Sequence, residues 1–397
     1  MKINDITGIK MASASSNTRY GERDDSLLVL IKKGSTISGK FTNNSFKSAA
    51  VITAQAHLEE CSGKEIVLMI NAGNANAGTG KKGAKDVLSC CKSVGKEMGI
   101  DPESVLPFST GVIGEHLKTD EYISAFVKAS KRLKSNNWKQ AAKSILTTDT
   151  KPKLLSRIIK NGSEEIAMTG FAKGSGMIRP DFATLLSFVF IDAKINRSLL
   201  DNIHSEALSE SFNRITVDGD TSPNDSSVLV ASGRTKSTVK KGTPIERKIR
   251  SAVIEIYKEL ADLLIQDAEG ATKKITIKVI QAKTEKQAES VAFTVAESPL
   301  VKTAMFGNDA NWGRILSAIG RSPEVNDVSK TSIHLNGVPL AKNGNLHPQH
   351  SEAKASKAIM KKNLDVTIKL GLGKNTFSVI TSDFSEDYLL INSDYRS

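Results

Sequence analysis

The spacing of apolar residues predicts three amphipathic helices. In segments 84–98, 122–133 and 245–266, apolar side chains recur every three or four residues. This period places them on one face of a helix, which can then pack against a core. The apolar positions are Val87, Leu88, Cys91, Val94 and Met98 in the first segment, Tyr122, Ile123, Phe126, Val127 and Leu133 in the second, and Ile249, Val253, Ile254, Tyr257, Leu260 and Leu264 in the third.

Other segments have the length and pattern of β-strands. Ser26–Ile31 and Glu65–Ile70 are short apolar runs, and two later segments alternate apolar with polar residues. The alternating apolar positions are Ile275, Ile277 and Val279 in one segment and Val366, Ile368 and Leu370 in the other. The turn Gly371–Asn375 then leads to Phe377 and Val379, which predicts a β-hairpin. Strands that alternate with helices indicate an α/β or α+β fold, with antiparallel hairpins at the sheet edges.

The segment 174–191, GSGMIRPDFATLLSFVFI, combines features that rarely occur together. A glycine-rich turn and a proline lead directly into an apolar strand, Leu185–Ile191, and Thr184 lies at the junction. Such a junction can strain the backbone and hold a side chain at the mouth of a pocket. A threonine at the start of a strand is also a common strand residue, so this segment alone leaves both interpretations open.

The composition is that of a folded protein. Of the 397 residues, 39% are hydrophobic and 25% are charged, which disfavours disorder. This length corresponds to roughly two to three domains or one large α/β domain. At this size a core can form without disulfides or metals.

Cysteine content and the apolar segments indicate the compartment. Cys61, Cys90 and Cys91 are the three cysteines, and this sparse, odd number favours a reducing environment. The first twenty residues lack the continuous apolar region of a signal peptide. The longest apolar runs are too short to span a bilayer. We therefore expect a cytoplasmic protein that does not bind a membrane.

A net charge of +12 raises the question of an anionic partner. The lysines are scattered along the chain, and the sequence contains no recognisable nucleic-acid-binding motif. Only 5% of the residues are aromatic, which leaves few side chains for base stacking. We therefore expect no nucleic-acid partner.

Two glycine-containing motifs could present backbone N–H groups. The segment 71–80, NAGNANAGTG, forms either an anion-binding loop or a structural turn, and composition favours neither. It is not a P-loop, because Thr79 stands where lysine is required. The segment 109–114, STGVIG, contains Thr110 and Gly111, whose hydroxyl and N–H can serve an oxyanion hole. Alone, such a pair is more often a turn.

Several other kinds of site are excluded by spacing. The segment 217–225, VDGDTSPND, is acidic like a calcium loop, but the twelfth position from Asp218 is Leu229 instead of glutamate. We interpret it as a hydrogen-bonded turn. The six histidines show no HExxH or Cys/His spacing, so we expect no metal and no cofactor. No GxSxG motif of a serine hydrolase is present. The segment 306–314, FGNDANWGR, has a composition suited to a site, but spacing does not define its role.

Taken together, these segments resemble the ornithine acetyltransferase family, also called glutamate N-acetyltransferase, of the cyclic arginine pathway. The resemblance runs nearly from end to end, and the matching blocks follow the family order. They are FTNNSFKSAAV at 41–51, NAGNANAGTG at 71–80, STGVIG at 109–114, TTDTKPK at 147–153, KGSGMIRPDFATLLSF at 173–188, RITVDGDTSPNDS at 214–226, DAEGATK at 267–273, FGNDANWGRILSAIG at 306–320 and INSDYRS at 391–397.

This resemblance implies a four-layer αββα sandwich of the N-terminal-nucleophile type, with a smaller C-terminal α/β part. It implies self-cleavage between Ala183 and Thr184, in the motif ATLL, which would give chains 1–183 and 184–397. Thr184 would be the nucleophile, and Thr110 and Gly111 would form the oxyanion hole. The substrate-binding residues that the resemblance implies are Thr147, Lys173, Thr184, Glu269, Asn392 and Ser397.

An N-terminal threonine can act without a Ser-His-Asp triad, and the sequence shows no triad motif. Cleavage would give Thr184 a free α-amine, whose pKa of roughly 7.7–8 suits a general base. The expected reaction transfers acetyl from N2-acetylornithine to glutamate through an acetyl-Thr184 ester. Some family members also accept acetyl-CoA, and no residue decides this for the present chain. The family also implies an α2β2 heterotetramer.

Two other functions remain open from the sequence. Related N-terminal-nucleophile proteins include aminopeptidases, which cleave amide bonds with water. Transfer of acetyl from acetylornithine to glutamate, in place of hydrolysis, distinguishes an acetyltransferase from these enzymes. A non-enzymatic binding module is the third interpretation, based on the glycine loops and positive charge. The intact nucleophile and oxyanion motifs argue against it.

Overall fold

A computed structural model describes residues 2–179, 185–235 and 238–395 of the chain. These residues divide into two compact units. The N-terminal unit holds the described residues of 2–174, 185–213 and 221–264, and the C-terminal unit holds 175–179, 214–220 and 265–395. Each unit has its own β-sheet structure and its own core.

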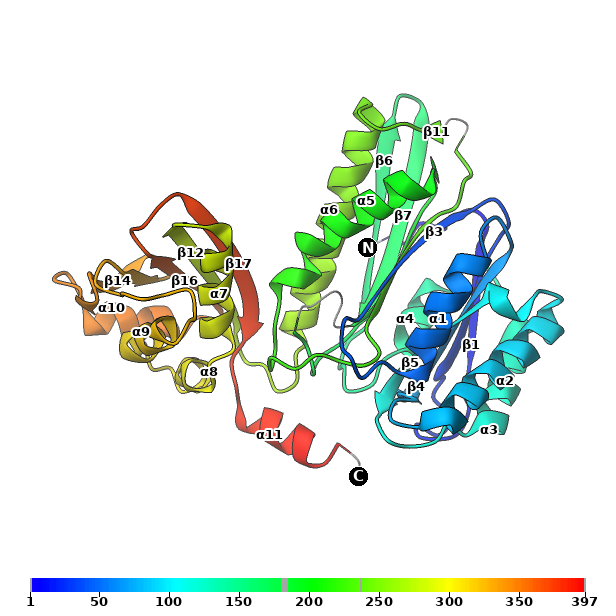
Figure 1. Cartoon of the computed structure of the whole chain (residues 1–397), viewed down its shortest axis with the longest axis horizontal. Helices are drawn as coiled ribbons and strands as arrows, with labels where there is room; N and C mark the ends of the chain where they lie inside the picture. The colour runs from blue at the N-terminus through cyan, green and yellow to red at the C-terminus, as the bar shows by residue number, and fades with distance from the viewer. Residues whose placement is uncertain (1, 180–184, 236–237, 396–397) are drawn as a thin grey trace. The chain divides into compact units, whose positions relative to one another are not determined.

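Two sheets form the centre of the N-terminal unit (Figure 1). The first has the order β1-β2-β4-β5, and the second has the order β3-β10-β8-β7-β6. Their bounds are Ile9–Ala14 for β1, Ser26–Ile31 for β2, Ile66–Asn74 for β4, Val105–Val112 for β5, Thr36–Phe41 for β3, Ser226–Ala231 for β10, Leu186–Ile191 for β8, Glu164–Lys173 for β7 and Lys153–Asn161 for β6. Only β4–β5 and β8–β10 pair in parallel within these two sheets.

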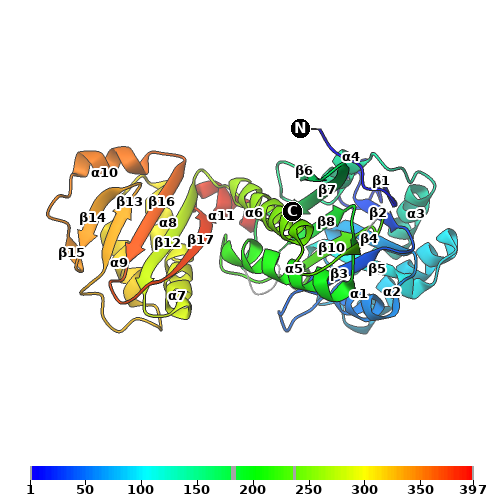
Figure 2. The same cartoon turned by 90° about the horizontal axis from the view of Figure 1, so that it is seen from above.

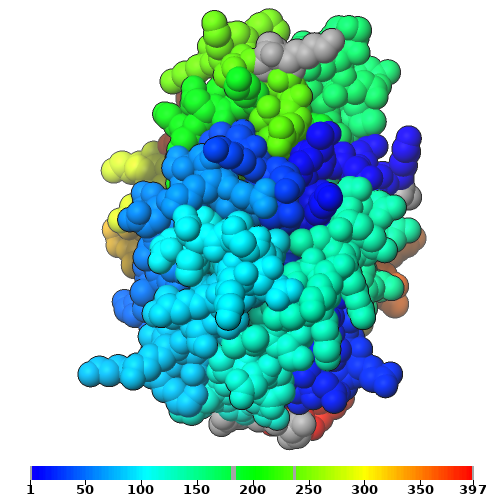
Figure 3. Space-filling view, turned by 90° about the vertical axis from the view of Figure 1, so that its right-hand side faces the viewer, coloured from blue at the N-terminus to red at the C-terminus, as the bar shows by residue number. Residues whose placement is uncertain are grey.

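Helices cover the outer face of each sheet. Helices α2 and α3 pack on the first sheet, where Cys91 and Phe126 share a core with Leu28. Helices α5 and α6 cover the second sheet in both ribbon views (Figure 1 and Figure 2), and His204 of α5 and Tyr257 of α6 both contact Ser227 of β10. The bounds are Gly80–Met98 for α2, Thr119–Ser130 for α3, Arg197–Ser209 for α5 and Pro244–Gln266 for α6. In the space-filling view, the light-blue to turquoise segment that includes α2 and α3 lies outermost on that side (Figure 3).

The inner faces of the two sheets pack against each other. Leu27 and Val29 of the first sheet share one core with Phe188 and Val228 of the second. Two further helices close the edges of this core, α1 (Ala49–Glu60) through Leu58 and α4 (Trp138–Ser144) through Trp138. The result is the four-layer αββα sandwich that the family resemblance implies. Strand β2 is buried on both faces, which explains its continuous apolar run.

The C-terminal unit contains one mixed sheet with the order β15-β14-β13-β16-β12-β17 (Figure 2). Alternate strand residues such as Ile277 and Val366 enter a core that helices α7 to α10 complete. The strand bounds are Lys274–Ala282 for β12, Ser332–Leu335 for β13, Val338–Lys342 for β14, Asn345–Leu346 for β15, Asn363–Lys369 for β16 and Asn375–Ser382 for β17. The helix bounds are Glu285–Ala296 for α7, Pro299–Phe306 for α8, Trp312–Gly320 for α9, Glu352–Ile359 for α10 and Glu386–Ser393 for α11.

Most of the predicted elements are confirmed, and one pairing is wrong. The three predicted helices correspond to α2, α3 and α6, although Leu133 lies beyond the end of α3. The predicted hairpin does not form, because β12 lies between β16 and β17. The connecting turn passes around the end of β12, where Leu372 and Gly373 both donate to the carbonyl of Gln281. Alternation identifies a strand but carries no information about its neighbour.

Within the described ranges, no helix combines the length and apolarity needed to cross a bilayer. The three cysteines are buried free thiols. Burial raises the pKa of the Cys90 thiol to about 12, so this group stays protonated at neutral pH.

Candidate active site

The structure brings together three of the predicted site residues in the N-terminal unit. Thr110 lies near the end of β5, Lys173 is the last residue of β7, and Thr147 follows α4. The Lys173 Nζ lies 3.1 Å from the Thr110 hydroxyl and 2.7 Å from the Thr147 hydroxyl. An ammonium group can only donate, so both hydroxyl oxygens accept from it. Each threonine therefore keeps its own O–H to donate elsewhere, as an oxyanion hole requires.

Lys173 is directed between the two sheets. Its register partner is Leu186 of β8, and Leu186 belongs to the core between the sheets. Lys173 itself is only 8% exposed. A buried ammonium is costly without a compensating negative charge, so its surroundings decide whether it can stay charged.

Asp149 supplies that charge, and the sequence-based selection of site residues missed it. Its Oδ2 lies 3.7 Å from the Lys173 Nζ, and its Oδ1 accepts from the Lys153 Nζ at 2.5 Å. Oδ1 also accepts the Gly174 N–H at 2.7 Å, and Oδ2 accepts the Thr147 N–H at 3.2 Å. The position of Asp149 close to lysines, in the block TTDTKPK, is the sequence feature that could have identified it.

The charges around Asp149 keep it ionised. Burial alone would raise the pKa of its carboxyl group, but the positive charges of Lys173 and Lys153 outweigh this effect. The pKa is lowered to about 2. At neutral pH the cluster is therefore a carboxylate between two ammonium groups, and it holds Thr147 through the backbone.

Gly111 occupies a place that only glycine fits. Its φ is +134°, and a Cβ there would lie 2.2 Å from the carbonyl carbon of Gly73. The β4–β5 register shifts at this point. Thr110 and Gly111 thus lie at the irregular end of a strand and not in a turn.

The segment NAGNANAGTG is held mainly by its own amide side chains. Strand β4 continues through Asn74, so the first half of the segment is strand and not turn. The Asn71 side chain donates to the Asn74 carbonyl, and the Asn76 N–H donates to the Asn74 side chain. The Ala75 N–H donates to the Val112 carbonyl, next to Gly111. These contacts make the segment a support for the Thr110–Gly111 strand end.

Two further predicted residues meet in the C-terminal unit. The Asn392 side chain on α11 donates to the Glu269 carboxylate at 2.9 Å. Glu269 is 7% exposed, and a Cβ on Gly176 would lie 2.3 Å from its Oε2. The Glu269 N–H also donates to the Ser175 carbonyl. Ser175 and Gly176 therefore lie close to the Glu269 residue.

Asp218 fixes the residues that follow this glycine-rich segment. Its carboxylate accepts the N–H groups of Met177 and Ile178 at 2.7 and 2.9 Å, and Tyr388 donates its hydroxyl at 3.4 Å. Met177 has a φ of +51°, which is unfavourable for a side chain of its size. Within the segment 217–225, Asp218 accepts the Asp220 N–H and Asp225 accepts the Ser222 N–H, which agrees with the predicted hydrogen-bonded turn. Across the described residues, no group of three or more His, Cys, Asp or Glu side chains could hold a metal.

Ala183, Thr184 and Ser397 lie outside the described residues. The structure does describe the strand that follows Thr184. The Leu185 carbonyl accepts the Ser226 N–H at 2.9 Å, and Leu186 pairs with Lys173 on one side and Ser226 on the other. The chain directly after Thr184 is therefore built into the sheet that carries Lys173.

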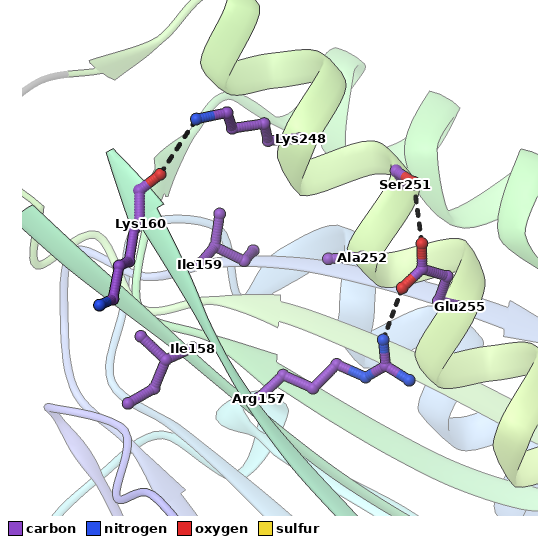
Figure 4. A pocket seen from close by; sticks show the side chains of 8 residues that line it. All are labelled: Arg157, Ile158, Ile159, Lys160, Lys248, Ser251, Ala252 and Glu255. Atoms are coloured by element: carbon purple, nitrogen blue, oxygen red, sulfur yellow. Dashed lines mark hydrogen bonds and ion pairs between the residues drawn. The ribbon is translucent and has the colours of Figure 1, made fainter. Parts of the chain in front are cut away.

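A separate pocket of about 410 Å³ lies between β6 and α6 (Figure 4). Arg157 forms an ion pair with Glu255 there, and the Lys248 Nζ donates to the Lys160 carbonyl. Arg157 and Glu255 thus neutralise each other on its wall. None of the predicted site residues lines this pocket.

Comparisons with known proteins place the chain in a family. The family model described as "ArgJ family" matches residues 10–397. The "Arginine biosynthesis bifunctional protein ArgJ" of Methylococcus capsulatus is 41% identical over 99% of this chain and 96% of its own length. The protein of the same name from Psychrobacter arcticus is 40% identical over 99% of this chain and 97% of its own length.

A solved structure agrees with these matches. The crystal structure of the arginine biosynthesis bifunctional protein ArgJ from Bacillus halodurans is 36% identical to this chain, with a TM-score of 0.51. All of that solved chain aligns with 53% of the present one. The motifs, the sandwich fold and these matches lead to one conclusion: the chain belongs to the ArgJ family.

Proposed function

We propose that this enzyme is a glutamate N-acetyltransferase of the cyclic arginine pathway, which transfers acetyl from N2-acetylornithine to glutamate. The observation that carries the proposal is the position of Lys173, whose ammonium group bonds both Thr110 and Thr147 beside Gly111. This group offers a cation and two hydroxyl donors for an acylated amino acid. The relatives named for arginine biosynthesis support the same assignment.

We further propose that the chain cleaves itself between Ala183 and Thr184. The Thr184 Oγ would attack the Ala183 carbonyl carbon, its proton would pass to the leaving nitrogen, and water would hydrolyse the resulting ester. The larger product, 184–397, would hold 214 residues, slightly more than half of the chain. The Bacillus halodurans chain, which aligns completely with 53% of this one, has the length expected of such a product.

The two products would remain associated. In the second sheet of the N-terminal unit, β3, β6 and β7 precede the proposed cut, and β8 and β10 follow it. Strand β8 is buried along its whole length between β7 and β10. Separating the products would expose this strand and break its hydrogen bonds, so cleavage should leave the fold intact.

Cleavage supplies the base for acetyl transfer. The Thr184 α-amine would take the proton from its own Oγ, which attacks the acetyl carbonyl carbon of N2-acetylornithine. The oxyanion would be held by the Thr110 hydroxyl and the Gly111 N–H. As the C–N bond breaks, the α-ammonium returns the proton to the ornithine nitrogen, and acetyl-Thr184 remains. The amine of glutamate then attacks this ester, giving N-acetylglutamate and restoring the Thr184 hydroxyl.

The substrate contacts follow from charge. Lys173 suits the α-carboxylate shared by both substrates, and Thr147 lies within reach of the same group. Glu269, held by Asn392, suits the side-chain ammonium of ornithine. From the sequence match, Thr184 and Ser397 complete the proposed set of substrate-binding residues.

Three finer features belong to the same proposal. The relatives named bifunctional support a second activity, in which acetyl-CoA acetylates glutamate. The family resemblance supports an α2β2 heterotetramer. The three buried free thiols agree with action in the cytoplasm.

A kinetic assay tests the proposal. Purified protein with N2-acetylornithine and glutamate should form equal amounts of ornithine and N-acetylglutamate. Ornithine release without N-acetylglutamate would indicate an aminopeptidase-like hydrolase and overturn the transferase assignment. A parallel assay with acetyl-CoA and no N2-acetylornithine tests the second activity.

A further inference from the structure

The side-chain oxygen of Asn224 is buried, and no described residue donates a hydrogen bond to it. The residue is 5% exposed, and its Nδ2 donates to the Ala75 carbonyl at 2.7 Å. Its Oδ1 is enclosed but accepts from no group in the described part of the chain. An unpaired buried acceptor destabilises a fold, so its presence calls for an explanation, and a role in binding or catalysis is one.

The hydrogen bonds around Asn224 connect it to the strand end that carries the proposed oxyanion hole. Ala75, which accepts from Asn224, donates its own N–H to the carbonyl of Val112, the residue after Gly111. A single residue, Ala75, therefore links the Asn224 carboxamide to the end of β5.

The second sheet places Asn224 at the same end as Lys173. Ser226 of β10 pairs with Leu186, and Leu186 pairs with Lys173, so the three form one row across the sheet. Asn224 precedes Ser226 by two residues. The carboxyl group of the intervening Asp225 lies within the electrostatic influence of Lys173.

We propose that Asn224 Oδ1 accepts the N–H of the acetamido group of the acetyl donor, and so acts as a specificity-determining residue. The inference rests on the proposed acetyl transfer. A secondary amide presents a carbonyl oxygen on one side and an N–H on the other. Thr110 and Gly111 would hold the oxygen, and Asn224 would hold the N–H. A site built in this way discriminates against a donor that lacks the N–H, because the acceptor then stays unpaired.

Two donors that differ in one atom test this assignment. The first is N2-acetylornithine, and the second is 2-acetoxy-5-aminopentanoate, in which oxygen replaces the α-nitrogen and the amide N–H is absent. The ratio of kcat/KM for the amide to that for the ester is measured with glutamate as acceptor. In Asn224→Ala this ratio should fall roughly threefold to tenfold, as expected for one lost neutral hydrogen bond. A purely structural role would lower both values together and leave the ratio unchanged, which would overturn the inference.

Two further variants complete the test. Asn224→Asp keeps an acceptor oxygen, so its ratio should stay near or above that of the wild type even if both rates fall. A low ratio in this variant would also contradict the inference. Asn44→Ala is the control, because both ends of the Asn44 carboxamide are paired, with Thr221 and Phe46, and its ratio should equal that of the wild type. If the wild type transfers acetyl from neither donor, the proposed function itself fails.

Discussion

The side-chain nitrogen of Lys173 lies 3.7 Å from Oδ2 of Asp149, and both groups are buried. The other oxygen of Asp149 accepts from Lys153 and from the Gly174 N–H. Groups outside the proposed substrate-binding set thus help to orient the carboxylate. It compensates the charge of Lys173 and leaves the ammonium group in contact with the two threonine hydroxyls.

Asp149→Asn should destabilise the protein by about 3 kcal/mol. The substitution leaves two buried ammonium groups without their shared carboxylate, and breaking a buried ion pair typically has this effect. Urea unfolding gives the free energy of unfolding. As a control, Asp101→Asn removes the exposed Lys64–Asp101 pair and should leave that free energy unchanged. Equal stability of the two variants would show that the buried cluster is not needed.

Lys173→Met should lower kcat/KM for N2-acetylornithine by roughly tenfold to a hundredfold, the effect of losing a charged hydrogen bond. KM for glutamate should also rise, because both substrates carry the α-carboxylate. Steady-state kinetics with each substrate varied in turn measures both effects. Wild-type kinetics in this variant would show that Lys173 does not bind the substrate carboxylate.

Glu269→Gln should change KM for one substrate and not for the other. Ornithine has a side-chain ammonium and glutamate has none, so KM for N2-acetylornithine should rise about tenfold while KM for glutamate changes little. Glu324→Gln, at a solvent-exposed ion pair with Lys286, is the matched control and should leave both constants unchanged. If Glu269→Gln raised KM for both substrates equally, the proposed ammonium contact would be wrong.

His204 should make the fold sensitive to acid. Its two ring nitrogens lie 2.9 and 2.8 Å from the hydroxyls of Ser38 and Ser227. Burial, with smaller contributions from Lys40 and Arg197, lowers its pKa to about 3. The unfolded chain, with a histidine pKa near 6.5, takes up a proton below that pH that the folded chain does not bind. Stability should therefore fall between about pH 6.5 and pH 3, by up to about 1.4 kcal/mol per pH unit.

The measurement is urea unfolding of wild type and His204→Asn between about pH 7.5 and pH 5, above the range in which Asp149 titrates. The variant should lose less stability than the wild type over this interval. If the two lose stability in parallel, His204 is not the group that titrates.

Local sequence patterns predicted the elements of this protein better than their pairing. Helix α6 and strand β2 follow from periodicity because each buries a defined set of apolar positions. The β16–β17 hairpin failed because β12, some ninety residues earlier, lies between them, and no local pattern encodes that pairing. The four-layer sandwich came from the family resemblance.

The site shows a similar division. Family motifs identified Thr110 and Lys173, and the structure brings them together. Asp149 and Asn224 were missed because their importance depends on burial and on partners distant in sequence. An aspartate or asparagine in a polar block is usually exposed, and only the fold reveals that these two are enclosed.

The central claim is that Thr184 becomes an N-terminal nucleophile that carries the acetyl group. The mass of the purified protein, measured under denaturing conditions before and after brief exposure to N2-acetylornithine without glutamate, tests this most directly. We expect two fragments, 1–183 and 184–397, of which only the larger gains the mass of one acetyl group. Thr184→Ala should remain one intact chain. An uncleaved wild-type chain of 397 residues, or cleavage without acetylation of the larger fragment, would contradict the account.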